Sequence, residues 1–183
     1  EEHYLQTYTA AKNLPFYSIT WERPAETGIE TAARQFRYQT FSRIMHEEGY
    51  DTLMTAHHGD DQIETILMKI LRGGQLSSFA GIKEIQPFAT GRLIRPLLSY
   101  SKEQLYEYAK ERQLIYFEDV TNQKLDVQRN RLRHLVIPRL KEENSQTLSH
   151  FQRFSKQIQW ADELIQKQMN EKVTELLQPL ANG

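Results

Sequence analysis

The stretch TAHHGDDQIET at residues 55–65 decides how this chain folds and where its chemistry lies. It joins a short β-rich run at 52–56 to a segment whose apolar residues recur at helical spacing between 63 and 70. We therefore predict a strand followed by a helix over 60–71, which the glycines at 73–74 terminate. The polar residues between them lie at the carboxyl end of a strand, the edge of an open α/β sheet at which ligands bind.

Predicted helices and strands alternate on both sides of this stretch. Before it, the sequence predicts a helix, a strand and a second helix, over 1–13, 16–21 and 29–48. After it, the sequence predicts a strand, a helix and a further strand, over 93–95, 102–112 and 115–117. Ser101 and Gln104 form a capping box for the second of these. The alternation favours an α/β fold with a parallel, Rossmann-like sheet.

The C-terminal part of the chain has a different pattern. Apolar residues recur every three or four positions between 148 and 176, which predicts one long amphipathic helix or a helix pair. We therefore expect a catalytic domain over residues 1–142, followed over 143–183 by a helical linker or the start of a C-terminal domain.

The composition excludes several classes of function. None of the 183 residues is cysteine, so disulfides, cysteine-ligated zinc and thiol catalysis are excluded within them. There is no apolar run of about 18 residues and no secretory signal, which fits a cytoplasmic protein without a membrane partner. The chain begins without methionine, so we expect a fragment. The formal net charge of -1 means that any nucleic-acid contact must come from a local basic patch.

The histidines and carboxylates of the 55–65 stretch are the strongest candidates for chemistry. Asp61 and Glu64 are three residues apart and share a helix face. These carboxylates can hold Mg²⁺, and His57 or His58 can bind phosphate or transfer a proton. The alternative is that the aspartates cap the helix, Glu64 is solvated and the histidines fill a turn.

Three groups of basic residues are weaker candidates. Arg34 and Arg37 lie one turn apart on a predicted helix and can clamp a phosphate, or they can form a solvated face with Glu30. Arg72 follows a helix end, where the helix dipole favours a cation in any case. A concentrated basic segment at 129–141 suggests a phosphate-backbone partner, or a face of salt bridges.

Taken together and in order, these motifs resemble the PP-loop, or N-type ATP pyrophosphatase, family, and most closely its members that form lysidine on tRNA. The matching elements cover about residues 1–142 and are Glu30…Ala33-Arg34-x-x-Arg37-Tyr38, Thr55-Ala56-His57-His58-x-x-Asp61-Gln62-x-Glu64-Thr65, Arg72-Gly73, Ile94-Arg95-Pro96-Leu97-Leu98, Glu118-Asp119-x-Thr121-Asn122 and Arg129-Asn130-Arg131-x-Arg133-His134.

The resemblance implies an ATP-dependent ligase that modifies tRNA(Ile). Such an enzyme adenylates C2 of the anticodon wobble cytidine with release of pyrophosphate, and lysine then displaces AMP to give lysidine. The implied partners are tRNA(Ile), lysine and ATP with Mg²⁺. The resemblance is compatible with a homodimer but does not determine the oligomeric state.

The resemblance also implies roles for individual residues. The catalytic set would be Arg34, His58, Asp61 and Glu64, with Asp61 and Glu64 binding Mg²⁺ or the lysine ammonium. The ATP and substrate pocket would add His57, Arg37, Arg72, Gly73 and Arg95. The tRNA would be held by Arg129, Asn130, Arg131, Arg133 and His134.

The chain departs from the family pattern in one respect. The ATP-binding loop Ser-Gly-Gly-x-Asp-Ser does not occur in it, so we expect these 183 residues alone to be inactive. Three alternatives stay open: a sulfur-transferring PP-loop enzyme that thiolates tRNA, a metal-dependent phosphoesterase built on the histidines and aspartates at 57–61, and a non-catalytic RNA-binding module.

Overall fold

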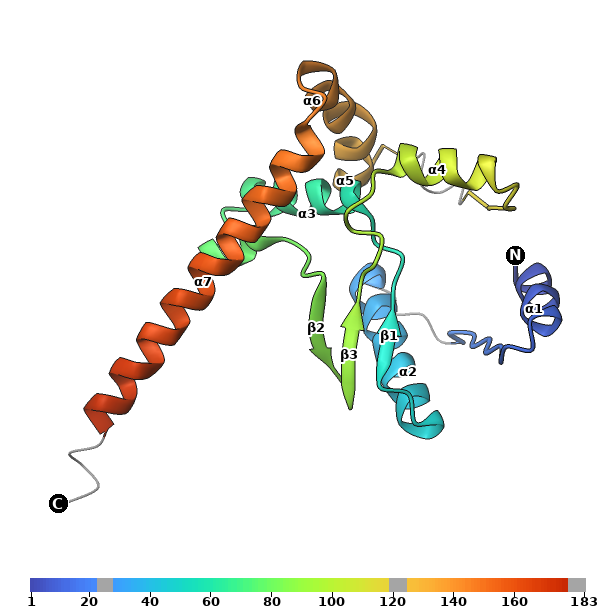
Figure 1. Cartoon of the computed structure of the whole chain (residues 1–183), viewed down its shortest axis with the longest axis horizontal. Coiled ribbons are helices and arrows are strands. Elements are labelled where there is room, and N and C mark those ends of the chain that lie inside the picture. Colours follow the sequence, from blue (N-terminus) through green and yellow to red (C-terminus); the bar gives the residue numbers. More distant parts are fainter. Residues whose placement is uncertain (23–27, 119–124, 178–183) are drawn as a thin grey trace. The chain divides into compact units, whose positions relative to one another are not determined.

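The computed structural model of the chain describes residues 1–22, 28–118 and 125–177. The helices and strands of these residues, in chain order, are α1 (Glu2–Ala11), α2 (Ile29–Glu48), β1 (Thr52–Met54), α3 (Gly59–Leu71), the 3₁₀-helix η1 (Leu76–Ala80), β2 (Ile85–Phe88), β3 (Gly91–Ile94), α4 (Lys102–Glu111), α5 (Gln128–Arg131), the π-helix η3 (Leu132–Val136), α6 (Ile137–Glu143) and α7 (Thr147–Leu177). The structure is a mixed α/β fold with a long C-terminal helix (Figure 1).

The sheet has three strands in the order β1-β3-β2. Arg92 N–H donates to the Asp51 carbonyl and Thr55 N–H to the Ile94 carbonyl, so β1 and β3 run parallel. The tight connection between β2 and β3 makes them an antiparallel hairpin. The prediction of a parallel sheet is therefore right for one strand pair and wrong for the other, and the sheet is mixed.

Two predicted strands are absent. The segments 16–21 and 115–117 have strand-like composition, yet neither forms a strand. β-propensity describes how well side chains fit a pleated surface, and a strand also needs a neighbour that completes its backbone hydrogen bonds. The composition of these segments indicated side chains that fit a pleated surface. It gave no information about whether a neighbouring strand is available.

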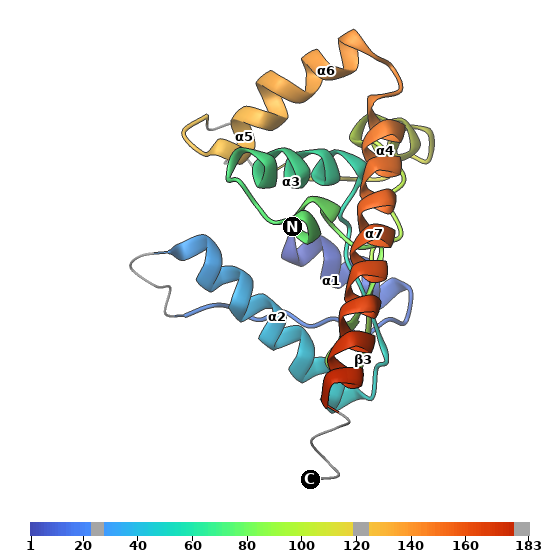
Figure 2. The same ribbon diagram turned by 90° about the vertical axis from the view of Figure 1, so that its left-hand side faces the viewer.

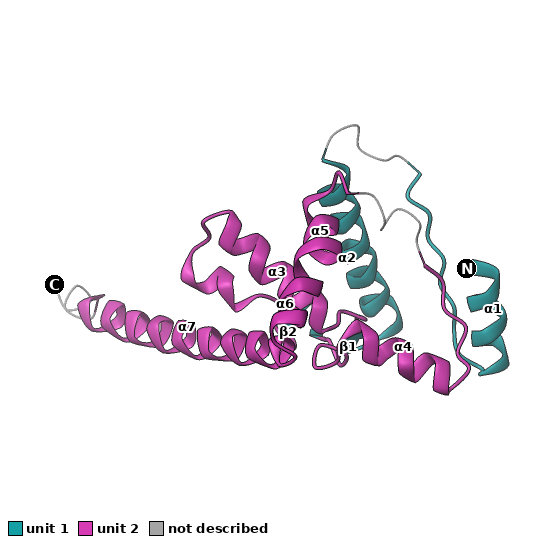
Figure 3. Cartoon of the chain, turned by 90° about the horizontal axis from the view of Figure 1, so that it is seen from above, with its two compact units in different colours: residues 1–53, 87–93 teal, residues 54–86, 94–183 magenta. Residues whose placement is uncertain are grey.

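The residues divide into two compact units, 1–53 with 87–93 and 54–86 with 94–183 (Figure 3). In the first unit, aromatic side chains pack along α2. The rings of Tyr38 and Phe88 meet edge-on with centroids 5.6 Å apart, and those of Trp21 and Phe36 stack at 5.8 Å. Met45, near the end of the helix, is buried.

The second unit is built around α3. Ile63 and Ile66 on this helix are completely buried, as predicted from their spacing. One side of α3 contacts α7 and η1, and the helix also contacts η3 and α6 (Figures 1 and 2). Helix α3, which carries the functional motif at its start, therefore packs against η3 and α6 as well as against α7.

Local sequence signals correctly predicted the end of α2 and the start of α4. Helix α2 covers the predicted range and ends at Gly49, whose φ of 71° lies in the left-handed region that glycine adopts readily. Ser101 accepts from the Gln104 backbone N–H, and the Gln104 side chain accepts from the Ser101 N–H, so the predicted capping box of α4 is confirmed.

The basic segment and the C-terminal pattern are both helical. The basic segment is helical and contains the π-helical turn η3. Pro138 lies in the first turn of α6, where proline is tolerated. The C-terminal pattern forms a single helix, α7. Among the described residues, no helix combines the length and apolar character needed to cross a membrane.

Candidate active site

The N-cap residue and the first two turns of α3 carry His58 and the carboxylates of the decisive stretch. His58 is the N-cap residue, and its backbone N–H donates to Asp61 Oδ2 at 3.0 Å. The His58 ring lies 3.5 Å from the same carboxylate and is half-buried. Asp61 therefore caps the helix, as the structural alternative proposed, and at the same time faces His58.

Asp61 and Glu64 form a four-residue ion cluster with two arginines of the basic segment. Arg129 Nε and Arg133 Nε each lie 2.6 Å from a different oxygen of Glu64. Their terminal nitrogens meet Asp61 Oδ1 at 3.0 and 3.1 Å. Glu64 is completely buried and Asp61 nearly so. The cluster brings together two groups to which the sequence assigned separate roles, catalysis and tRNA binding.

This pairing decides whether Mg²⁺ fits at Asp61 and Glu64. Both Glu64 oxygens and Asp61 Oδ1 accept from guanidinium groups, while Asp61 Oδ2 accepts from the helix start. A metal would have to displace both arginines. In the part of the chain that the structure describes, no group of three or more His, Cys, Asp or Glu is arranged to hold a metal ion. The residues of this arrangement therefore do not fit Mg²⁺.

A second ion network lies beside the first, and sequence reasoning missed it. Asp60 is 5% exposed, and its Oδ1 lies 2.6 Å from Lys141 Nζ, while its Oδ2 accepts from the Lys102 backbone N–H. Lys141 also reaches Glu103 at 2.8 Å. The network connects the starts of α3 and α4 to α6. Its only sequence signal was the double aspartate, which also fits ordinary helix capping.

The Lys141–Glu103 pair has a defined pH dependence. Partial burial, the largest single effect, disfavours the charge of Glu103. The hydrogen bonds from Lys141, from the Glu103 backbone and from Ser101, together with the positive charge of Lys141, outweigh it and lower the pKa of Glu103. For Lys141, burial likewise disfavours the charge, and the hydrogen bonds to Asp60 and Glu103 raise its pKa. Stabilisation by Glu103 is therefore present above the unfolded-state pKa, about 4.3, and is lost as the pH falls through the lower folded-state pKa.

We expect Glu103→Gln to destabilise the protein by at most about 1 kcal/mol above pH 5, because Glu103 is largely exposed and solvent screens the pair. The difference from the wild type should shrink as the pH falls below about 4, where the glutamate becomes protonated. Urea unfolding at a series of pH values measures it. A difference that stays constant down to pH 2 would contradict the assigned pair.

The arginines predicted on α2 and after α3 do not belong to either ion network. Arg34 and Arg37 lie on α2 in the first unit, where the Arg34 guanidinium covers the Tyr38 ring at 4.7 Å. Arg37 lines a groove of about 350 Å³ between α2 and the segment 17–21. Arg72 is exposed after α3, with Gly73 in the left-handed region, and contacts Gln128 at 3.5 Å.

Arg95 is a buried cation. It is 4% exposed, and its Nη1 donates to the Lys83 carbonyl at 2.5 Å and to Gln86 at 3.3 Å. Within the described residues, no carboxylate pairs with it. These contacts connect Arg95 to Lys83 and to Gln86 of β2.

The other candidates lie on α5, on η3 and just before α3. Arg131 donates to the carbonyls of Leu125 and Asp126 at 2.9 and 2.7 Å. Asn130 is buried, and His134 lines a small recess next to Arg133. His57 Nδ1 lies 2.9 Å from the Thr55 hydroxyl. The motif Glu118-Asp119-x-Thr121-Asn122 falls largely outside the described residues.

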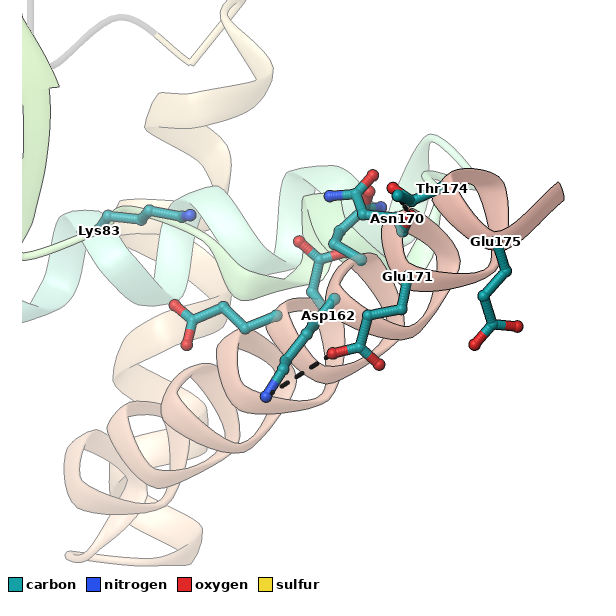
Figure 4. A pocket seen from close by; sticks show the side chains of 9 residues that line it. Lys83, Asp162, Asn170, Glu171, Thr174 and Glu175 are labelled. Carbon is teal, nitrogen blue, oxygen red and sulfur yellow. Dashed lines mark hydrogen bonds and ion pairs between the residues drawn. The ribbon is translucent and has the colours of Figure 1, made fainter. Parts of the chain in front are cut away.

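A large recess on the described surface lies away from this site. It has a volume of about 800 Å³ and lies along α7, between Lys83 and side chains such as Asp162 and Glu171 (Figure 4). None of the predicted site residues lines it. The recess is an open surface beside a helix, so chemistry rather than volume identifies the candidate site.

The sequence is similar to proteins of one family. Residues 1–140 match the PP-loop domain family. The chain is 49% identical to the tRNA(Ile)-lysidine synthase of Enterococcus faecalis over 184 residues, which is all of this chain and 40% of that protein. It is 48% identical to the enzyme of Lactiplantibacillus plantarum over 160 residues, 86% of this chain and 36% of the relative.

The fold and the site define an α/β protein with its polar centre where a strand leads into a helix. The family match extends over most of the chain, and the chain belongs to the PP-loop domain family. It spans about two fifths of the length of the curated relatives to which it is similar.

Proposed function

We propose that the protein from which these residues come is an ATP-dependent ligase that forms lysidine on tRNA(Ile). The identity of nearly one half to proteins named tRNA(Ile)-lysidine synthase supports the proposal. The observation that carries it is the pair of buried carboxylates, Asp61 and Glu64, which holds cationic side chains at the start of α3. Its partners would be ATP, lysine and tRNA(Ile), in the cytoplasm.

The reaction needs two steps. In the first, the C2 oxygen of the cytidine attacks the α-phosphorus of ATP and pyrophosphate leaves. In the second, a lysine amine attacks C2, and AMP leaves with the oxygen. Both steps depend on placing the reacting atoms in line and on neutralising charge at the phosphate.

We assign the lysine ammonium, rather than a metal, to the Asp61–Glu64 pair. Guanidinium groups already occupy these oxygens, so the pair is suited to a cationic side chain with N–H donors. Lysine binding would require Arg129 or Arg133 to move, and the released arginine would then be available for a phosphate. His58, which faces Asp61, would assist at the phosphate or at the cytidine.

The remaining assignments are part of the same proposal. Arg34 and Arg37 would contact substrate from α2, with Arg72, Gly73 and His57 close to the nucleotide. Mg²⁺ would be held by ATP rather than by the Asp61–Glu64 pair. Residues 143–183 would link this domain to the rest of the protein, and a homodimer is compatible with the proposal.

Asp61→Asn tests the proposal in the full-length protein. We expect lysidine formation to fall by about 100-fold or more, because the uncharged side chain no longer binds a cation while its side-chain oxygen can still cap the helix. Glu163→Gln, an exposed change on α7, is the matched control and should leave the rate unchanged. Near-normal turnover by Asp61→Asn would remove this residue from the site.

The basic segment supplies the proposed tRNA contacts, through Arg129, Asn130, Arg131, Arg133 and His134. Arg131→Ala should weaken tRNA binding and reduce the slope of log affinity against log salt by roughly one unit. Filter binding at several salt concentrations measures this slope. If Arg131 only holds the carbonyls of Leu125 and Asp126, the slope will not change.

Two other functions receive less support. A PP-loop enzyme that thiolates tRNA fits the same family, and the nature of the product distinguishes it. A metal-dependent phosphoesterase built on residues 57–61 would need a metal-binding group, and none is found among the described residues.

A further inference from the structure

Gln62 is a buried residue of the functional stretch that the proposed chemistry does not use. It is 2% exposed, and its side-chain amide is fully engaged. Its Oε1 accepts from the Ile82 N–H at 2.6 Å, and its Nε2 donates to the Ser155 hydroxyl at 2.7 Å. Ser155 belongs to α7, 93 residues further along the chain.

Ser155 lies at the centre of a polar contact between α7 and the rest of the second unit. It is 2% exposed, donates to the Ala80 carbonyl at 2.6 Å and accepts from Gln159 at 3.1 Å. Gln152, one turn earlier on α7, donates to the Leu98 carbonyl at 3.3 Å. A buried donor or acceptor left without a partner costs about 1–3 kcal/mol, so this polar contact favours one register of α7.

A second contact of α7 lies closer to the site. Gly59 is buried, and a Cβ atom at this position would come within 2.4 Å of Leu148 Cδ1. Leu148 therefore packs directly on the backbone of the first residue of α3. The Gly59 N–H donates to the Tyr100 carbonyl at 2.7 Å, which fixes the backbone from another direction.

These contacts lie on the face of α3 opposite the carboxylates. Successive residues of an α-helix are about 100° apart, so residues 59, 62 and 66 share one face while Asp61 and Glu64 share the opposite one. The helix is thus held between α7 on one face and Arg129 and Arg133 on the other. A shift of α7 along or towards α3 would move the carboxylates relative to their arginines.

We propose that Leu148 and Ser155 are positioning residues, through which α7 sets the position of the first turn of α3. Neither touches a reacting atom. They fix Gly59 and Gln62, and through these the geometry of Asp61 and Glu64. Helix α7 would in this way couple the candidate active site to any part of the protein that engages its exposed far end, where Leu176 is 73% exposed.

The test uses the full-length protein and three single variants. Ser155→Ala removes the buried hydroxyl, and Ser155→Thr retains it. Ser149→Ala is the matched control, because it makes the same change on the same helix where the exposed hydroxyl bonds only to the Gln146 carbonyl. Each variant is compared by hydrogen exchange at amides 59–64, by the kcat and KM of lysidine formation, and by melting temperature.

We expect Ser155→Ala to speed exchange at amides 59–64 by about tenfold, because the first turns of α3 open more readily. It should also lower kcat by about tenfold, because a small misplacement of catalytic groups slows the reaction. The KM for tRNA should stay within about twofold of the wild-type value. Ser155→Thr should restore both values, and Ser149→Ala should match the wild type. The kinetic readout rests on the proposed function, whereas the exchange readout does not. If the wild type forms no lysidine, the proposed function fails, and exchange alone decides the positioning role.

One result would overturn the inference. If Ser155→Ala lowers the melting temperature but leaves exchange at amides 59–64 and kcat equal to those of Ser149→Ala, Ser155 only stabilises the fold. Equal exchange in Ser155→Ala and Ser155→Thr would also contradict it, because the proposal depends on the hydroxyl.

Discussion

Replacing Glu64 by glutamine should lower the free energy of unfolding by about 3 kcal/mol. Glu64 is completely buried, and both of its oxygens accept from guanidinium groups at 2.6 Å. Glutamine keeps the shape but removes the charge, and its NH₂ group faces the donors of Arg129 and Arg133. We expect a value near the lower end of the range for breaking a buried ion pair, because the Arg129 side chain is 34% exposed and solvent compensates part of its charge.

Urea unfolding of the wild type and the variant measures this difference. Glu171→Gln is the control, because Glu171 forms an exposed i,i+4 pair with Lys167 at 3.9 Å and its removal should cost less than about 0.5 kcal/mol. If Glu64→Gln costs no more than this control, the cluster does not contribute to stability. The folded protein would then be equally stable with Arg129 and Arg133 facing an uncharged side chain.

Gly91→Ala should be the second strongly destabilising change, with a loss of about 2–3 kcal/mol. A Cβ atom at this position would lie 2.0 Å from the Asp51 carbonyl oxygen and 2.6 Å from its carbon. These are backbone atoms, and the same carbonyl accepts from the Arg92 N–H that joins β3 to β1. The methyl group can be accommodated only if the start of this strand pair separates.

Thermal unfolding of Gly91→Ala can be compared with that of Gly73→Ala. Gly73 has a φ of 65°, but a Cβ atom added there would have no neighbour within 4 Å, so its substitution adds only backbone strain, of about 1–2 kcal/mol. Similar or smaller destabilisation by Gly91→Ala would mean that β1 and β3 separate at this point without cost.

The helices could be predicted from the sequence because their signals are local. The spacing of Ile63 and Ile66, the glycine after α2 and the Ser101–Gln104 capping box all act within one or two turns. Strands could not be predicted as well. The segment 16–21 has strand composition, but a strand also depends on a partner that can lie anywhere in the chain, and composition does not identify it.

For the candidate site, the sequence by itself indicated candidate residues and predicted that the carboxylates lie near the start of a helix. It identified Asp61, Glu64, Arg129 and Arg133 as functional candidates but treated them as two separate groups. Only the tertiary structure decided that the arginines bind these carboxylates, because residues 65 to 72 positions apart meet there. The same holds for Ser155 and Gln62, since neither residue type carries a local signal for a contact across 93 positions.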